Sequence, residues 1–371
     1  EITFYPFRPQ QGHQRLGIRR IGEPGYFYDL VHGIYFSANV SRQSRINRVF
    51  CCNLLFLYVN IMKQYDLAEG MRMYIARLRE QGRYSSAKSY QDALNSFLRF
   101  CGQEMILYTR IDREMLLRYQ DYLRDRECSW NTVSTYMRRI RRVYGLAMEN
   151  GEAPFSRYLF KGIFLGVKSK QKKALPAESL RLLMTAPLAA PELRKTQRAL
   201  CLMFLFCGMA FVDFAHLKKS DIRNGVLRYN RQKTGTPMLV EIQPVARELL
   251  AALMTDTLRD SPYLFTFLSG TKTGEEAFRE YTSALADFNR SLKELANACG
   301  VTEIVTSYSI RHSFATTLKE QGVPIEMISE LLGHQSIKTT QIYLKSFSLD
   351  RMSAVNKACF ESIYNEVSKV G

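Results

Sequence analysis

Two stretches decide the fold: residues 307–317 read SYSIRHSFATT, and residues 331–343 read LLGHQSIKTTQIY. Apolar residues at helical spacing lead into the second stretch, and Gly333 is typical of the end of a helix. Ser336 is a favourable N-cap for a following helix, whose second turn then presents Tyr343. The two stretches therefore predict a helix, a tight stop and a second short helix that carries a tyrosine.

Arg311, His334 and Tyr343 carry functional information through their joint spacing. Alone, a tyrosine at helical spacing is usually a core residue and a histidine after a helix is usually a cap. Here Arg311 precedes His334 by 23 residues and Tyr343 follows it by nine, with R-H-x-F-A-T at 311–316 and L-G-H at 332–334. This combination resembles the tyrosine recombinase, or phage integrase, family over roughly residues 66–365. GMAFVD at 208–213 further resembles integrases of conjugative transposons and related mobile elements of anaerobic gut bacteria.

The resemblance implies a role for each motif residue. Tyr343 would attack a backbone phosphate, giving a 3′-phosphotyrosyl enzyme and a free 5′-hydroxyl. Arg311 would clamp the non-bridging oxygens, because a planar fork of donors suits a phosphorane, and His334 would support the same phosphate. Lys233, at the tip of a basic hairpin, would protonate the leaving 5′-oxygen, since an alkoxide is a poor leaving group. His312 is a further family-like histidine, catalytic or structural.

Two positions depart from the family pattern. Ala210 stands where the first-box arginine is expected, and the loss of one preorganised donor costs roughly 3 kcal/mol, or 10²- to 10³-fold in rate. We expect another cation to substitute, and Lys218, Arg198 and Arg194 are within reach in the sequence. Tyr308 replaces the histidine expected three positions before the second-box arginine, so it can form a hydrogen bond but cannot act as an imidazole.

The charge balance points to a polyanionic partner. The 371 residues include 52 Lys plus Arg against 35 Asp plus Glu, a formal net charge of +17, with 46% hydrophobic and 12% aromatic residues. This is a globular composition rather than a disordered basic tail. Such a surplus is usually compensated by nucleic acid or an anionic membrane surface.

Composition also argues against several protein classes. The longest uncharged run, residues 199–212, is 14 residues long and too short to span a bilayer, and no secretory signal pattern is present. The eight cysteines form no C-x-x-C pair and no zinc-ligand spacing, so we expect reduced thiols in a cytoplasmic protein and no metal. No phosphate-binding loop pattern is present, and no cofactor is expected, because a phosphotyrosine stores the energy of the broken bond without ATP.

The chain divides into four predicted regions. Residues 1–61 lack a regular period and contain no methionine, which favours either an additional DNA-contacting segment or sequence upstream of the true start. Residues 66–150 predict four amphipathic helices in a compact, SAM-like core-binding bundle. Residues 151–175 read as a basic linker, and residues 176–371 as a mostly helical catalytic domain with a small β-hairpin and a C-terminal packing helix. The expected fold class is mainly α.

Two clusters of basic residues are candidates for contacts with the DNA backbone. The first lies on the fourth predicted helix and comprises Arg138, Arg139, Arg141 and Arg142. The second lies in the predicted linker and comprises Lys168, Lys170, Lys172 and Lys173. Charged helix faces are usually only solvated, but four arginines without an interleaved acid favour phosphate contact.

The main hypothesis is therefore a site-specific DNA recombinase acting on double-stranded DNA. Four protomers with one tyrosine each would exchange strands between two duplexes as a homotetramer, and an accessory DNA-bending protein is compatible with this scheme. The helix expected from Asp350 would dock on a neighbouring protomer or pack on its own domain. The alternatives are a DNA-binding homologue weakened by Ala210 and a type IB topoisomerase.

Overall fold

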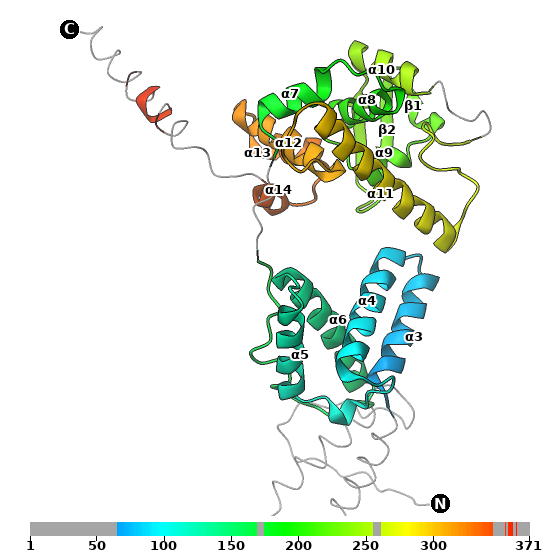
Figure 1. Cartoon of the computed structure of the whole chain (residues 1–371), viewed down its shortest axis with the longest axis vertical. Coiled ribbons are helices and arrows are strands. Elements are labelled where there is room, and N and C mark those ends of the chain that lie inside the picture. Colours follow the sequence, from blue (N-terminus) through cyan, green and yellow to red (C-terminus); the bar gives the residue numbers. More distant parts are fainter. Residues whose placement is uncertain are drawn as a thin grey trace, which may run out of the picture. The chain divides into compact units, whose positions relative to one another are not determined.

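The computed structural model describes residues 65–168, 174–254 and 261–343, together with 353, 355–358 and 361. This part of the chain divides into two compact units, one before and one after residue 169. Its elements are mostly helices, with one three-stranded antiparallel sheet (Figure 1). The predicted mainly helical class with a small hairpin is confirmed. The expected N-terminal segment 1–61 lies outside the described residues, and so does most of the predicted C-terminal helix.

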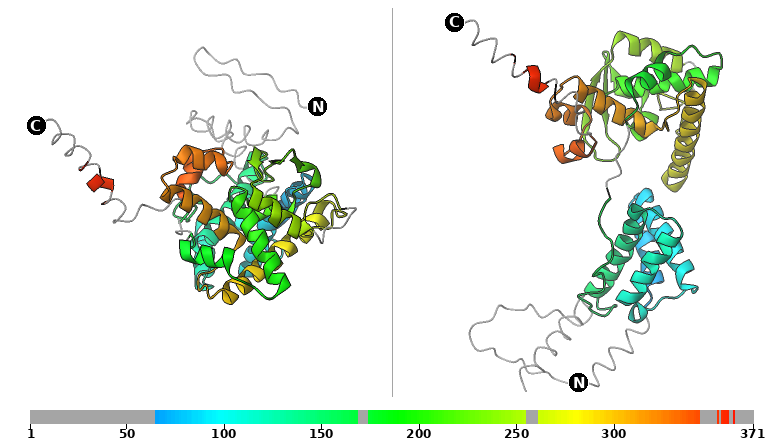
Figure 2. Two further views of the ribbon diagram at one scale, coloured as in Figure 1. Left: turned by 90° about the horizontal axis from the view of Figure 1, so that it is seen from above. Right: turned by 60° about the vertical axis from the view of Figure 1, so that its left-hand side comes forward.

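The first unit is a bundle of four helices (Figure 2). They are α3 (Leu67–Glu80), α4 (Tyr84–Cys101), α5 (Arg113–Asp125) and α6 (Trp130–Glu149), with the 3-10 helix η1 (Tyr108–Arg110) before α5. Polar residues begin three of the helices: Asp66 caps α3, Asp112 caps α5 and Ser129 caps α6 through hydrogen bonds to backbone N–H groups. Each cap satisfies a donor that the first helical turn leaves without an intrahelical partner.

The core of the first unit follows the predicted apolar stripes. On α3, Met71, Ile75 and Leu78 are buried, and α4 and α6 bury equivalent rows of apolar side chains. The buried hydroxyl of Tyr119 donates to Ser96 Oγ at 2.9 Å, so this polar group has a partner inside the core.

The first unit extends beyond the predicted boundary at residue 150. Ala153, Leu159 and Ile163 are buried in the same apolar cluster as the four helices. The predicted start of the linker at 151 is therefore wrong, because turns without a helical period can still contribute to a core. Of the four predicted linker lysines, Lys168 is described, and the other three, at 170, 172 and 173, lie outside the described residues.

The second unit combines a helical cluster with the small sheet. Its elements are α7 (Ala177–Thr185), α8 (Pro191–Leu205), α9 (Phe211–Ala215), η2 (Lys219–Asp221), β1 (Ile222–Arg223), β2 (Val226–Asn230), β3 (Pro237–Glu241), α10 (Pro244–Met254), α11 (Gly274–Ala298), α12 (Ser307–Glu320), α13 (Ile325–Leu331) and α14 (Ile337–Tyr343). The strands are in the order β1-β2-β3, and Leu227 on β2 pairs with Val240 on β3. Both side chains are buried, so this register directs one face of the hairpin toward the core.

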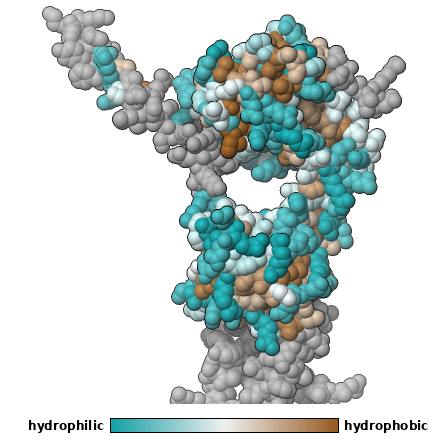
Figure 3. Space-filling view, viewed as in Figure 1, coloured by the Kyte–Doolittle hydropathy of each residue, from teal (hydrophilic) through white to brown (hydrophobic). Residues whose placement is uncertain are grey.

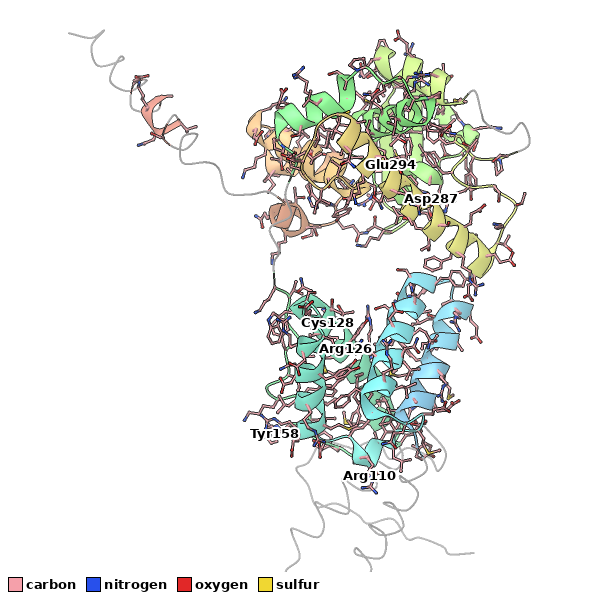
Figure 4. All side chains as sticks on the ribbon, viewed as in Figure 1. Arg110, Arg126, Cys128, Tyr158, Asp287 and Glu294 are labelled. Atoms are coloured by element: carbon pink, nitrogen blue, oxygen red, sulfur yellow. The ribbon has the colours of Figure 1, made fainter. Side chains whose placement is uncertain are left out.

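Aromatic side chains form much of the core of the second unit. Phe214 stacks on Phe265 with ring centroids 4.4 Å apart, and Phe211 stacks on Phe288 at 4.6 Å. The opposite side of α11 faces solvent and is charged, as Asp287 shows in Figure 4. Helix α11 is therefore amphipathic.

The surface of each unit is predominantly hydrophilic, with apolar residues in separate patches (Figure 3). Within the described ranges, none of the helices combines the length and the apolar character that crossing a bilayer requires.

Candidate active site

Arg311 is the centre of the site. It lies on α12, which begins after the capping residue Thr306, and its side chain is buried with 3% of the residue exposed. Its Nη1 donates to Gly208 O at 3.0 Å, and its Nη2 donates to Leu332 O. These carbonyls hold the guanidinium in one orientation, so the fork is preorganised before any anion arrives.

Gly333 allows the chain to bring His334 to Arg311. Helix α13 ends just before it, Gly333 has φ +61°, and the backbone N–H of His334 donates to Ser329 O at 2.9 Å. A Cβ at Gly333 would lie 2.5 Å from Met238 Sδ and 2.7 Å from Arg231 Cδ. Both the backbone conformation and the close packing therefore require glycine here.

His334 is held as a neutral imidazole with its proton on Nδ1. Its Nε2 lies 3.2 Å from Arg311 Nη2, and a guanidinium can only donate, so Nε2 accepts. Its Nδ1 lies 2.8 Å from Thr340 Oγ1 and therefore donates to that hydroxyl. Burial, followed by the positive charges of Arg311, Arg231 and Lys233, lowers the pKa of His334 to about 4.

Thr340 connects this cluster to the helix that carries the predicted nucleophile. Thr340 is fully buried on α14, and Tyr343 is the last residue of that helix. The hydrogen bond between Thr340 and His334 thus fixes α14 beside the Arg311 cluster. The side chain of Tyr343 lies outside the described part of the structure.

Lys233 lies in the turn of the β2–β3 hairpin, as the sequence predicts. The turn is closed by Gly235 N–H donating to Arg231 O at 2.8 Å and Arg231 N–H donating to Thr236 O at 2.9 Å. Gln335 Nε2 donates to Thr234 O at 3.3 Å, which ties the turn to the loop after His334. The exposed Lys233 is therefore carried by a turn that contacts the site.

Asp213 follows Ala210 by one turn of α9 and is almost fully buried. Its Oδ1 accepts from the backbone N–H of Gln232 at 2.7 Å, and its Oδ2 lies 3.6 Å from Arg231 Nε. The buried cation that faces Asp213 is thus Arg231 and not one of the three cations expected from the sequence. One of those three, Arg194, instead donates to the backbone carbonyl of Leu188.

Arg231 is the functional residue that the sequence reasoning missed. It stands two positions before Lys233 in a basic hairpin, and this R-x-K pattern was the available signal. Its Nη1 donates to Gly333 O at 2.8 Å, directly beside the carbonyl of Leu332 that Arg311 holds. Two guanidinium groups therefore bind consecutive carbonyls of one loop.

The remaining predicted residues on α12 lie on different sides of the helix. His312 is buried, and its ring packs edge-on against Tyr308 with centroids 4.7 Å apart. Tyr308 is 40% exposed, so the residue that replaces the expected histidine reaches the surface of the unit.

The arginine cluster of the first unit lies on α6. Arg138 and Arg141 are exposed, whereas Arg139 packs over the ring of Tyr90 at 4.8 Å, with Nε donating to Ser89 Oγ at 3.1 Å. Arg142 is exposed as well and forms a side-chain hydrogen bond with a tyrosine of α3. One of the four arginines is thus used partly for packing, and three present their charge to solvent.

Lys168 is anchored rather than part of an open linker. Its backbone exchanges two hydrogen bonds with the side chain of Asn131, each 2.8 Å long. Its Nζ lies 4.6 Å from the centre of the Trp130 ring, which Arg124 approaches at 4.9 Å. Aromatic stacking of this kind orients both cations at the beginning of α6.

Profiles of two families match the chain. Residues 173–349 match the phage integrase family, and residues 66–163 match the phage integrase SAM-like domain. The tyrosine recombinase XerA of Pyrococcus furiosus is 32% identical over 189 residues, or 50% of this chain and 62% of that protein. A probable integrase/recombinase protein of Methanocaldococcus jannaschii is 25% identical over 314 residues, or 79% of this chain and 92% of that protein. The chain thus spans less than two thirds of the length of the XerA relative.

Solved structures share the fold at low sequence identity. A lambda integrase dimer bound to a COC′ core site has a TM-score of 0.59 at 14% identity, covering 87% of this chain and 91% of that one. The Tn1549 transposon integrase in complex with transposon right end DNA has a TM-score of 0.55 at 12% identity, covering 79% and 99%. A lambda integrase tetramer bound to a Holliday junction has a TM-score of 0.58 at 16% identity, covering 82% and 88%.

Proposed function

Because the chain belongs to the phage integrase family of tyrosine recombinases, we propose that it is a site-specific DNA recombinase that cuts and rejoins duplex DNA. The observation that carries the proposal is the buried contact of Arg311 with His334, which Thr340 joins to the helix ending at Tyr343. A preorganised guanidinium beside a tyrosine-bearing helix suits attack on a phosphodiester.

The chemistry divides among four side chains. The Tyr343 hydroxyl attacks the scissile phosphorus and the bond to the 5′-oxygen breaks, leaving a 3′-phosphotyrosyl link and a free 5′-hydroxyl. Arg311 neutralises charge on the non-bridging oxygens. His334 supports the same phosphate by accepting from Arg311 at Nε2, which keeps the fork oriented. Lys233 protonates the departing 5′-oxygen.

The exposed position of Lys233 fits its role. An acid that delivers a proton to the leaving oxygen must reach the phosphate only when DNA is bound, and Lys233 is exposed in a hairpin turn. Arg311 has the opposite requirement, since it must be fixed in advance, and it is buried.

The first unit and the assembly supply the DNA partner and the second active tyrosine. The exposed arginines of α6, with Lys168 and the lysines that follow it, contact the phosphate backbone of double-stranded DNA. Solved relatives of this fold are bound to DNA, and one is a tetramer on a Holliday junction. We propose the same homotetrameric arrangement, with the segment after Asp350 docking on a neighbouring protomer.

A DNA-binding homologue without cleavage activity is the second candidate, and Ala210 is the observation that favours it. In this case the protein retains DNA binding through α6 and forms no covalent intermediate. A topoisomerase of type IB would instead relax supercoiled plasmids of any sequence.

Covalent trapping tests the proposal and identifies the target sequence in the same experiment. The full chain is incubated with nicked, fragmented genomic DNA of its source organism, and protein–DNA adducts are isolated on a denaturing gel and sequenced. The expected result is an adduct at one recurring sequence, absent in Tyr343→Phe and present in the control Tyr158→Phe, whose tyrosine is exposed in the first unit (Figure 4). DNA binding without any adduct would overturn the recombinase and leave the binding homologue.

A further inference from the structure

Ala210 leaves the site one cation short of the family pattern, while the carboxylate beside it remains. Asp213 is 2% exposed and lies one helical turn after Ala210, where it would face an arginine at position 210. A buried carboxylate is costly unless a cation or several donors compensate it. The fold therefore needs a positive group here whatever residue supplies it.

Arg231 supplies that group from another element. It follows the last residue of β2, its side chain is buried, and its Nε lies 3.6 Å from Asp213 Oδ2. The adjacent Gln232 N–H donates to Asp213 Oδ1 at 2.7 Å, so Asp213 holds both the backbone and the side chain of the hairpin base. Neither this pair nor the bond from Nη1 to Gly333 O uses Nη2 of Arg231, which remains a donor.

Arg231 and Arg311 converge on one spot. They donate to Gly333 O and Leu332 O, which are consecutive carbonyls, and His334 follows directly in the chain. Both guanidinium groups, with Lys233, act as positive charges on the His334 imidazole and lower its pKa. One carboxylate, Asp213, accompanies two buried arginines, so the cluster carries a positive surplus suited to an anion.

We propose that Arg231 is the second cationic clamp of the scissile phosphate and performs the role that an arginine at position 210 would otherwise have. The proposal rests on the recombinase function proposed above. Nη2 of Arg231 binds one non-bridging oxygen while Arg311 binds the phosphate beside it, and Asp213 holds Arg231 in place. The displaced arginine reaches the site from the strand rather than from α9.

The test uses the trapped target sequence as a synthetic nicked duplex, with a normal phosphodiester or with a methylphosphonate at the scissile position. A methylphosphonate lacks the negative charge that the second cation neutralises. Arg231→Ala is expected to slow adduct formation about 10²- to 10³-fold on the phosphodiester. On at least one methylphosphonate diastereomer the loss should shrink to less than about 10-fold. Arg228→Ala, an exposed arginine on the same strand, should change neither rate appreciably.

Arg231→Lys keeps the proposal testable if the alanine variant does not fold. It retains the charge that pairs with Asp213 but lacks the planar fork, so we expect normal DNA binding and at least about 10-fold slower cleavage, again relieved by methylphosphonate. An equal loss on both substrates would mean that Arg231 is only structural, and full activity of Arg231→Ala would exclude it from the site. Adduct formation by the wild type in either case leaves the proposed function intact, whereas its absence overturns both.

Discussion

Gly333→Ala is expected to destabilise the second unit and to slow DNA cleavage at the same time. The residue has φ +61°, and its Cβ would lie 2.5 Å from Met238 Sδ and 2.7 Å from Arg231 Cδ. Ordinary contact begins at 3.4 Å, so these atoms must move by 3.4 − 2.5 = 0.9 Å and 3.4 − 2.7 = 0.7 Å. The left-handed backbone costs about 1 kcal/mol, and forced displacement of buried side chains costs about 1–3 kcal/mol. The sum is about 2–4 kcal/mol.

Gly322→Ala is the matched control for this prediction. Gly322 also has positive φ, +83°, in the same unit, but a Cβ there meets no atom within 4 Å. It should lose only the backbone cost of about 1 kcal/mol. The difference between the two variants therefore isolates the crowding of Arg231 and Met238.

Urea unfolding followed by far-UV circular dichroism measures the free energy of unfolding of each variant. Trp130 is the single tryptophan and lies in the first unit, so its fluorescence provides a reference transition that neither substitution should shift. Adduct formation should fall about 10-fold or more in Gly333→Ala, because displacement of a clamping group by a fraction of an ångström is costly. Equal destabilisation by the two alanines, or an unchanged cleavage rate in Gly333→Ala, would refute the reasoning.

Three further predictions concern the same cluster. The pKa of His334 is lowered to about 4 in the folded protein from an unfolded value of about 6.5, so its contribution to stability is complete above pH 6.5 and is lost as the pH falls toward 4; the free energy of unfolding of His334→Gln should therefore fall less steeply over that range than that of the wild type. Thr340→Val should slow cleavage about 10-fold by removing the acceptor of the Nδ1 proton, and Thr340→Ser should restore it in the same adduct assay. Ala210→Arg should not accelerate the wild type beyond about 3-fold, since Asp213 is already paired, but should partly rescue Arg231→Ala; a large gain in the wild type would contradict the pairing.

The sequence allowed the outline of the site to be predicted because its parts are local. Gly333 was expected to end a helix, and α13 does end one residue before its C-cap, Leu332. The spacing from His334 to Tyr343 likewise predicted a short helix, and α14 is that helix. Such features depend on helix termination and periodicity, which a few neighbouring residues determine.

Arg231 could not be found in this way because its role depends on two contacts distant in the sequence. Its partners are Asp213 on α9 and the carbonyl of Gly333, 102 residues further along the chain. The protonation of His334 was equally hidden, since it follows from the position of Arg311. The linker boundary failed for a different reason, because the buried residues 153–163 lie in turns that lack any period.

The pairing of alanine at 210 with arginine at 231 has a consequence for sorting genomes. If the strand supplies the arginine, the two positions are interdependent, and a sequence with neither arginine is expected to bind DNA but not to cleave it. A sequence with alanine at the first position and R-x-K in its hairpin, as here with Arg231 and Lys233, should not be classified as a degenerate relic. A search for intact enzymes that requires only the first arginine would discard such chains, whereas a search for either arginine, together with the buried aspartate, would retain them.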